Sequence, residues 1–140
     1  IPVIVASPQS AKGVATESMV ETVDIYPTLC ELAGLPAPSG IDGKSFAAVV
    51  RKPHEKTRDF VTHVYPRGNR LGRAIRNERF RMVEWKVTGA APDSAEIELY
   101  DYKSDPLETK NIADQSPEVV AALRAKLDEQ PEAKPQYRKK

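Results

Sequence analysis

The chain has 140 residues, a formal net charge of +1 and a single cysteine. That length predicts about one domain, and the lone cysteine excludes a scaffold held together by disulfides. No apolar run approaches the roughly 18 residues of a membrane-spanning helix, which excludes an integral helical membrane protein. The 12 prolines predict that loops and turns take up much of the chain.

Residues 1–5 are apolar and β-branched, and they predict a short buried strand. They contain neither a basic segment nor a small-residue cleavage site, so they do not form a signal peptide. A buried strand seldom opens a natural chain, and we therefore expect that the sequence is part of a longer protein.

Residues 20–35 predict a helix with clear boundaries. Asp24 is a suitable N-cap, Pro27 falls in the first turn, and Gly34 ends the helix. An apolar stripe is expected along this helix, formed by Ile25, Leu29 and Leu32. If nothing covers them, the residues 1–5 strand and this helix would leave an exposed apolar patch.

A shorter helix is predicted after the turn at Asp42-Gly43. Ser45 is its expected cap, and Pro53 ends it. Its apolar residues are Phe46, Val49 and Val50.

From residue 58 onward, β-branched and aromatic residues predict strands instead of helices. Strands are expected at 60–65, 72–76, 79–87 and 96–102. The second and third form a hairpin through a two-residue turn at Asn77-Glu78. The segment therefore predicts a small antiparallel sheet.

A last helix is predicted from Ser116, as N-cap, and Pro117, at the first helical position. Its apolar stripe is formed by Val119, Val120, Leu123 and Leu127. Residues 131–140 are polar and basic, and we interpret them as a tail.

Charge is unevenly distributed along the chain. Residues 51–90 carry 11 basic and 4 acidic side chains, whereas residues 91–120 carry 2 basic and 8 acidic ones. Six arginines lie within 15 residues: Arg67, Arg70, Arg73, Arg76, Arg79 and Arg81. One interpretation is a solvated face with ion pairs to the acidic stretch.

The other interpretation is anion recognition, because a guanidinium can pair bidentately with carboxylate or sulfate oxygens. Arg67 and Arg73 are the candidates for this role, since they lie in a Tyr-Pro-Arg block and a Gly-Arg block. His63 alternates with Tyr65 on the predicted strand, so both could face a cleft. His63 could equally be a hydrogen-bonded structural residue.

Other polar residues have simpler explanations. Asp24 lacks a second carboxylate at a spacing useful for a metal, so capping is the better explanation. Cys30 lies among leucines and is expected to be a buried hydrophobic residue. Asp105 precedes a proline, so turn chemistry explains it better than calcium binding.

Several sequence blocks together resemble one enzyme family. They include an Asp-x-x-Pro-Thr pattern from Asp24, the Asp42-Gly43-Lys44-Ser45-Phe46 block, and residues 98–101 with 105–113. Tyr65-Pro66-Arg67 and residues 72–76 are similar to iduronate-2-sulfatase-like proteins. Over roughly residues 1–128 the chain resembles the C-terminal portion of a sulfatase, in the alkaline-phosphatase-like superfamily.

The resemblance implies an α+β arrangement: a small antiparallel sheet with a C-terminal helix packed on it, preceded by a strand-helix remnant of a larger α/β domain. Residues 1–53 would be the edge of the α/β catalytic domain, residues 54–130 the C-terminal sheet subdomain, and residues 131–140 the basic tail. The rest of the catalytic domain would then be the partner of this chain.

The family's catalytic groups do not fall within this sequence. Sulfatases use a formylglycine made from Cys or Ser, with Pro or Ala two residues on and Arg four residues on, beside a divalent cation that is usually calcium. Cys30 is followed at these offsets by Leu32 and Gly34, and no serine fits either. We therefore expect no catalytic residue and no metal ligand here, no sulfate-ester hydrolysis by these 140 residues alone, and calcium and formylglycine in the parent enzyme.

The implied function is to shape the substrate cleft of a sulfuric-ester hydrolase for a sulfated glycan or similar anionic substrate. The candidate substrate-binding residues are His63, Tyr65, Arg67 and Arg73. Family members are commonly periplasmic, secreted or lysosomal, and no nucleic-acid or membrane partner is expected.

Two alternatives remain open at this point. The parent could hydrolyse phosphoesters or phosphonates, as other members of the superfamily do. The chain could also be a stand-alone module that binds RNA or another polyanion, with the arginines interleaved with Tyr65, Phe80 and Trp85.

Overall fold

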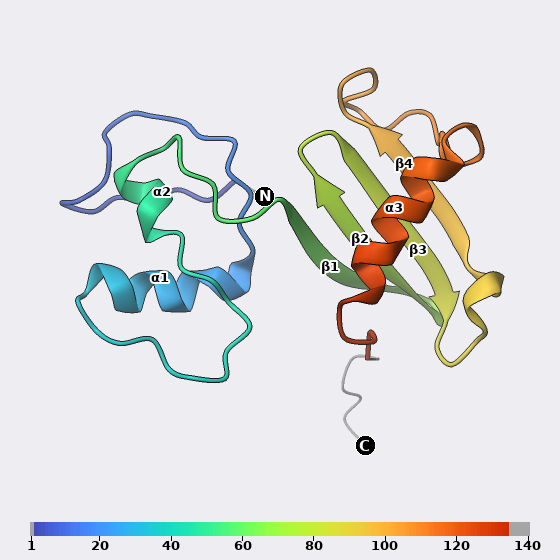
Figure 1. Cartoon of the computed structure of the whole chain (residues 1–140), viewed down its shortest axis with the longest axis horizontal. Helices are drawn as coiled ribbons and strands as arrows, with labels where there is room; N and C mark the ends of the chain where they lie inside the picture. The colour runs from blue at the N-terminus through green and yellow to red at the C-terminus, as the bar shows by residue number, and fades with distance from the viewer. Residues whose placement is uncertain (1, 135–140) are drawn as a thin grey trace. The chain divides into compact units, whose positions relative to one another are not determined.

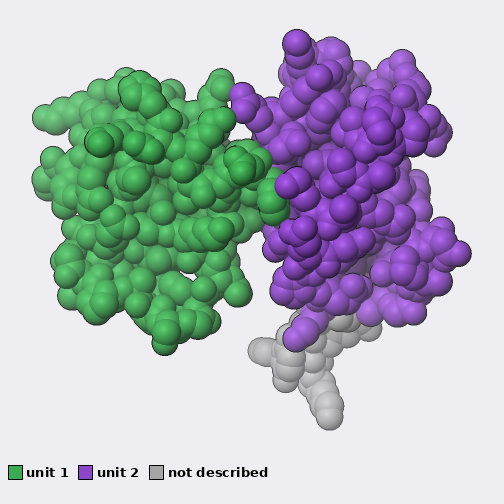
Figure 2. Space-filling model, in the orientation of Figure 1, with its two compact units in different colours: residues 1–61 green, residues 62–140 purple. Residues whose placement is uncertain are grey.

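The computed structural model describes residues 2–134 and divides into two compact units, residues 1–61 and residues 62–140 (Figure 2). The domain border that we predicted after residue 53 lies inside the first of these units. Part of the predicted tail, residues 135–140, lies outside the described residues. Among the described residues, no helix is long and apolar enough to cross a membrane.

The first unit contains three short helical elements (Figure 1): η1 (Thr22–Asp24), α1 (Ile25–Leu32) and α2 (Ala47–Arg51). Its small core is built on the buried side chains of Phe46, Val49 and Val50, with Val20 and Leu32 packed against them. The two predicted helices are therefore present, each shorter than expected.

The predicted strand at residues 1–5 is wrong for the part that the structure describes. Residues 2–5 have no regular structure, and Ile4 is 91% exposed. A strand needs a neighbouring strand to pair its backbone groups, and no strand occurs in residues 2–59. These residues are apolar and β-branched, as a buried strand requires, but no strand in residues 2–59 is present to pair with them.

Two of the three residues of the predicted α1 stripe, Ile25 and Leu29, are exposed, whereas Leu32 packs against the core. Ile25 is 40% exposed and Leu29 is 59% exposed, whereas Pro27, Thr28 and Cys30 are buried. The large apolar side chains that the structure exposes in the first unit are Val3, Ile4, Val5, Val14, Val23, Ile25, Tyr26, Leu29, Leu35 and Ile41.

The second unit is built around a four-stranded antiparallel sheet in the order β1-β2-β3-β4. The strands are β1 (Phe60–Arg67), β2 (Arg70–Asn77), β3 (Phe80–Val87) and β4 (Glu96–Asp101). Two short elements, η2 (Pro92–Ser94) and η3 (Ala113–Gln115), lie in the connections, and α3 (Pro117–Asp128) ends the fold.

The hairpin between β2 and β3 forms as predicted, with its turn one residue later. Strand β2 ends at Asn77 and β3 begins at Phe80, so Glu78 and Arg79 form the turn. The Asn77 side chain fixes it, because its Oδ1 accepts hydrogen bonds from the backbone N–H groups of Arg79 at 2.9 Å and Phe80 at 2.7 Å.

Helix α3 lies across one face of the sheet (Figure 1), with Leu123 and Leu127 buried beneath it. The predicted burial of these two leucines is confirmed, while Val120 is only half-buried. Ser116 occupies the N-cap position, although its side chain makes no capping hydrogen bond. The predicted α+β sheet-and-helix arrangement is thus confirmed for the second unit.

The strand register separates the sheet residues into two faces. Arg73 opposes Glu84, and Ile75 opposes Met82, on the face that α3 covers. Because side chains alternate along a strand, Gly72 and Trp85, which also oppose each other, lie on the opposite face. This division decides which candidate site residues can act together.

Candidate functional site

The Asp-x-x-Pro-Thr pattern begins at a fully buried carboxylate, that of Asp24. Its Oδ2 accepts the Glu21 backbone N–H at 2.8 Å and Arg58 Nε at 2.9 Å, and its Oδ1 accepts the Lys44 backbone N–H at 2.7 Å. Arg58 also contacts Oδ1 through Nη2. Asp24 therefore acts as a hub for three segments, which corrects the prediction that its side chain caps α1.

The same contacts set the ionisation of Asp24. Burial, the largest influence, raises its pKa, but the hydrogen bonds from Arg58, Glu21 and Lys44 together outweigh it and lower the pKa below the ordinary value. The carboxylate is thus held in its charged form by partners that it also holds in place.

Two further residues of the sequence blocks complete this hub. The Thr28 hydroxyl donates to the Asp24 carbonyl at 2.6 Å and accepts the Phe46 backbone N–H at 3.0 Å. At Gly43, a Cβ atom would lie 2.0 Å from the Val23 carbonyl oxygen, so any larger residue would push the segments apart. The two N-terminal blocks therefore form one structural unit.

Three of the four candidate substrate-binding residues share one face of β1. His63, Tyr65 and Arg67 alternate along the strand, and all three side chains are exposed. The guanidinium carbon of Arg67 lies 5.8 Å from the centre of the Trp85 ring, so they share the face that α3 does not cover.

Trp85 forms the base of this site because of the residue opposite it. A Cβ atom added to Gly72 would lie 2.7 Å from the Trp85 ring, which shows that the indole packs directly on the β2 backbone. The indole Nε1 is buried without a hydrogen-bond partner among the described residues. The ring thus presents a fixed aromatic surface beneath Arg67.

Arg81 lies on the same face and affects His63. Partial desolvation, and then the positive charge of Arg81, lower the pKa of His63 below its ordinary value. Neutral pH therefore favours the uncharged imidazole, which can both donate and accept a hydrogen bond.

Arg81 is itself held firmly. Both oxygens of Glu108 accept from its guanidinium, which also lies over the Tyr100 ring at 5.2 Å. Glu108 adopts a positive φ of 55°, uncommon for a residue with a side chain, and its carboxylate also accepts from the Tyr102 hydroxyl. These contacts fix the guanidinium of Arg81 on the face that carries His63.

The structure does not bring the fourth candidate, Arg73, to this site. Arg73 lies on the α3 face and is only 7% exposed. Its Nη2 contacts Asp128 at 2.8 Å and Glu84 at 3.3 Å. The four residues predicted as one site therefore belong to two opposite faces of the sheet. Side chains alternate between the two faces along each strand, and Arg73 of β2 lies on the α3 face, whereas His63, Tyr65 and Arg67 of β1 lie on the other.

Three of the six clustered arginines form ion pairs with the acidic stretch at residues 91–120, as the first interpretation expected. Arg70 contacts Glu96 at 2.5 Å, Arg79 contacts Asp101 at 2.8 Å, and Arg81 contacts Glu108. Within residues 2–134, Arg67 takes part in no such ion pair. Arg76, also exposed on this face and likewise without an ion pair among the described residues, lies over the Tyr102 ring at 4.4 Å. Arg67 is thus the exposed arginine beside His63 and Tyr65 whose charge is available to an external anion.

The residues present do not fit the family's metal. The described part of the chain contains no group of three or more His, Cys, Asp or Glu side chains that could hold an ion. Asp101 is engaged by Arg79, and Asp105 accepts from Thr109 and from the Lys110 backbone within its turn. Cys30 is buried in α1.

Sequence reasoning named Trp85 only in the polyanion-binding alternative and Arg81 only in the arginine cluster, and it gave Glu108 no role. The predicted register could not have found the Trp85 contact, because a turn at Asn77-Glu78 sets Gly72 opposite Val83; the observed register sets Gly72 opposite Trp85, a pairing that favours direct ring-on-backbone packing. Glu108 had no local signal either, since its contact with Arg81 joins positions 27 residues apart.

The sheet-and-helix fold is that of the C-terminal part of a sulfatase. It aligns with the crystal structure of a putative sulfatase from Bacteroides thetaiotaomicron with a TM-score of 0.63 and 31% identity, over 76% of this chain and 23% of that one. The chain belongs to the family described as "N-sulphoglucosamine sulphohydrolase, C-terminal", whose model matches residues 1–133.

Curated relatives agree with this assignment. A Delta 4,5-hexuronate-2-O-sulfatase from Bacteroides thetaiotaomicron is 34% identical over 139 residues, which cover 92% of this chain and 28% of that protein. Arylsulfatase K from Xenopus laevis is 31% identical over 133 residues, covering 91% of this chain and 25% of that protein. The chain thus spans about a quarter of the length of these relatives.

Proposed function

We propose that this chain is the C-terminal part of a sulfuric-ester hydrolase that acts on a sulfated, acidic glycan. The membership of the sulfatase family supports this proposal, and so does the similarity to a relative named for a hexuronate, which is a sugar acid. These relatives are sulfatases, and they give no support to the phosphonate-hydrolase or RNA-binding alternatives.

In this proposal the described residues recognise the substrate, and the rest of the catalytic domain cleaves it. Calcium and formylglycine would belong to that other part, since no group of described residues could hold a metal ion. The exposed apolar side chains of α1, such as Ile25 and Leu29, would contact the catalytic domain, which is the expected partner.

The proposal depends mainly on the exposure and the contacts of the Arg67 guanidinium. Its guanidinium is exposed, lies over a fixed aromatic ring, and makes no ion pair within the described residues. Such a group can bind a sugar carboxylate bidentately, while the Trp85 ring fixes its orientation. Tyr65 and a neutral His63 on the same face would supply hydrogen bonds to sugar hydroxyls.

The test compares two substrates in the whole enzyme. Arg67→Ala should lower kcat/KM for an acidic sulfated glycan by about 10- to 150-fold, since it removes a charge-assisted contact worth roughly 1.5–3 kcal/mol. A small neutral aryl sulfate, which lacks the carboxylate, should be hydrolysed almost normally.

Arg79→Ala is the matched control, because this arginine is half-exposed but already paired with Asp101. It should leave both rates close to those of the wild-type enzyme. An equal loss on both substrates in Arg67→Ala would show a structural role, and no loss on either would show that Arg67 is a solvated side chain; both results contradict the proposal.

A further inference from the structure

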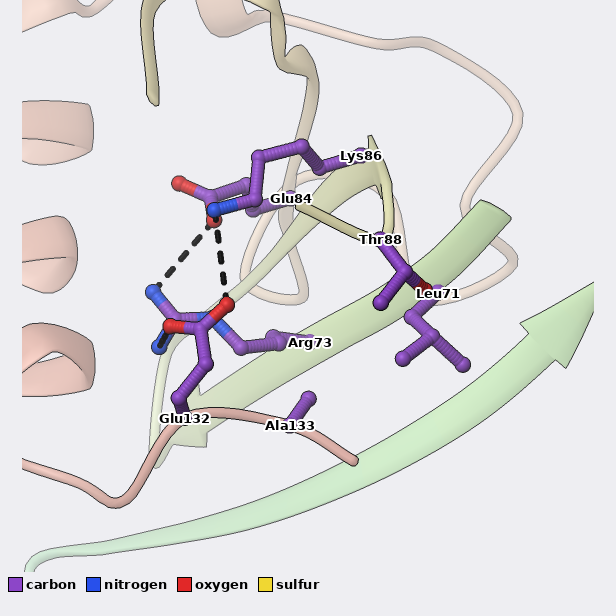
Figure 3. A pocket seen from close by; sticks show the side chains of 7 residues that line it. All are labelled: Leu71, Arg73, Glu84, Lys86, Thr88, Glu132 and Ala133. Carbon is purple, nitrogen blue, oxygen red and sulfur yellow. Dashed lines mark ion pairs between the residues drawn. The ribbon is translucent and has the colours of Figure 1, made fainter. Parts of the chain in front are cut away.

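A small cavity lies where β2, β3 and the segment after α3 meet (Figure 3). Its charged lining consists of Arg73, Lys86 and two carboxylates, those of Glu84 and Glu132, and its volume is about 10 Å³, enough for one water molecule. It lies on the α3 face, opposite the face of His63 and Arg67, and forms no part of the function proposed above.

Two cations converge on one carboxylate in this cavity. The Glu132 carboxylate lies 3.7 Å from Arg73 Nη1 and 3.5 Å from Lys86 Nζ (Figure 3). Both distances exceed those of a good charge-assisted hydrogen bond. Glu132 is 68% exposed, whereas the side chains of Arg73 and Lys86 are only 9% and 15% exposed. The cations are therefore sheltered, and the anion is loosely held.

Arg73 also retains unused hydrogen-bonding capacity. Its Nη2 is engaged by Asp128 and Glu84, but its Nε is buried without any partner among the described residues. Buried donors are nearly always paired in folded proteins, so an unpaired one beside a cavity needs an explanation. A ligand with several acceptor oxygens would satisfy this donor and Lys86 better than the distant carboxylate does.

We propose that Arg73 and Lys86 form a binding site for a small oxyanion, of which sulfate is the best match, and that Glu132 occupies it as an internal competitor. Sulfate offers four oxygens to donors that come from different directions: the Arg73 Nε–H, which has no partner among the described residues, and the Lys86 ammonium group, which has only the distant Glu132 carboxylate as an ion-pair partner there. The cavity admits only a water while Glu132 is in place, so the anion must displace that side chain.

The experiment follows the Arg73 Nε–H resonance of ¹⁵N-labelled protein during titration with sodium sulfate at constant ionic strength. Glu132→Gln removes the competing charge and should tighten sulfate binding by about two- to five-fold, the range expected for losing an exposed ion pair. Lys86→Met should weaken binding by at least a similar factor. Sodium acetate, titrated in parallel, should bind more weakly than sulfate.

Glu129→Gln is the matched control, because it removes the same charge from an exposed position at the end of α3 that does not line the cavity. It should leave the affinity unchanged. The proposal is overturned if Glu129→Gln tightens binding as much as Glu132→Gln does, if acetate binds as well as sulfate, or if sulfate leaves the Arg73 resonance unmoved in both the wild-type protein and Glu132→Gln.

Discussion

The Asp24 hub offers the most direct test of how the sequence blocks hold the first unit together. Asp24→Asn keeps the shape of the side chain but removes its charge, and it turns one acceptor into an NH₂ group that faces donors from Glu21, Lys44 or Arg58. Breaking a buried ion pair costs about 3–5 kcal/mol. Arg58 keeps a contact to Glu21 at 3.3 Å, so we expect the lower end, about 3 kcal/mol.

Amide hydrogen exchange measures this loss locally. The backbone N–H groups of Lys44 and Phe46 are bonded to Asp24 and Thr28, so they exchange only when the hub opens. A loss of about 3 kcal/mol should reduce their protection by roughly 100-fold. Glu31→Gln weakens exposed contacts with Arg51 and with the Ser45 hydroxyl, and it should reduce the protection by less than about five-fold.

The pH dependence gives a second readout of the same hub. Because folding lowers the pKa of Asp24, its stabilising contribution is complete above the ordinary value of 3.8 and is lost as the pH falls through the lower, folded-state pKa. Wild-type protection at Lys44 should therefore decline below about pH 4, and Asp24→Asn should lack this decline. Protection in Asp24→Asn within about two-fold of wild type would refute the reasoning.

Three further predictions concern the second unit. Gly72→Ala places a Cβ atom 2.7 Å from the Trp85 ring. It should therefore shift the fluorescence of this single tryptophan and lower the free energy of unfolding by about 1–3 kcal/mol. An unchanged fluorescence spectrum would contradict the packing of the ring on Gly72. Glu84→Gln removes the negative charge that pairs with the buried Arg73 and with Arg124, so urea unfolding should show a free energy of unfolding lower by about 3–5 kcal/mol. Glu96→Gln, which breaks an exposed ion pair with Arg70, should lower it by less than about 1 kcal/mol. Arg79 is the main cause that lowers the pKa of Asp101 to about 2, so the stability that this carboxylate adds is present above pH 3.8 and lost towards pH 2. Thermal unfolding of Asp101→Asn should show a weaker dependence on pH in that range, and identical profiles would count against the Arg79 contact.

The sequence by itself determined the elements of the second unit and the family of the chain. Strand alternation, the Asn77 turn and the Pro117 helix start depend on residues close together in the chain, so they could be recognised without a tertiary structure. The blocks around Asp24 and Gly43 were recognised by their resemblance to a known family. The structure adds the physical reason for these residues: Gly43 has no room for a side chain, and Asp24 lies at the centre of a buried network.

Only the tertiary structure decided which arginine shares a face with His63 and Tyr65. Arg67 and Arg73 looked equivalent in sequence, but the pairing of β2 with β3 turns Arg73 beneath α3, where its Nη2 contacts Glu84 and Asp128. The same holds for residues 2–5, whose apolar pattern forms no strand where no neighbouring strand is present. Side-chain direction and strand pairing depend on residues that are distant in the chain, so the local sequence pattern cannot predict them.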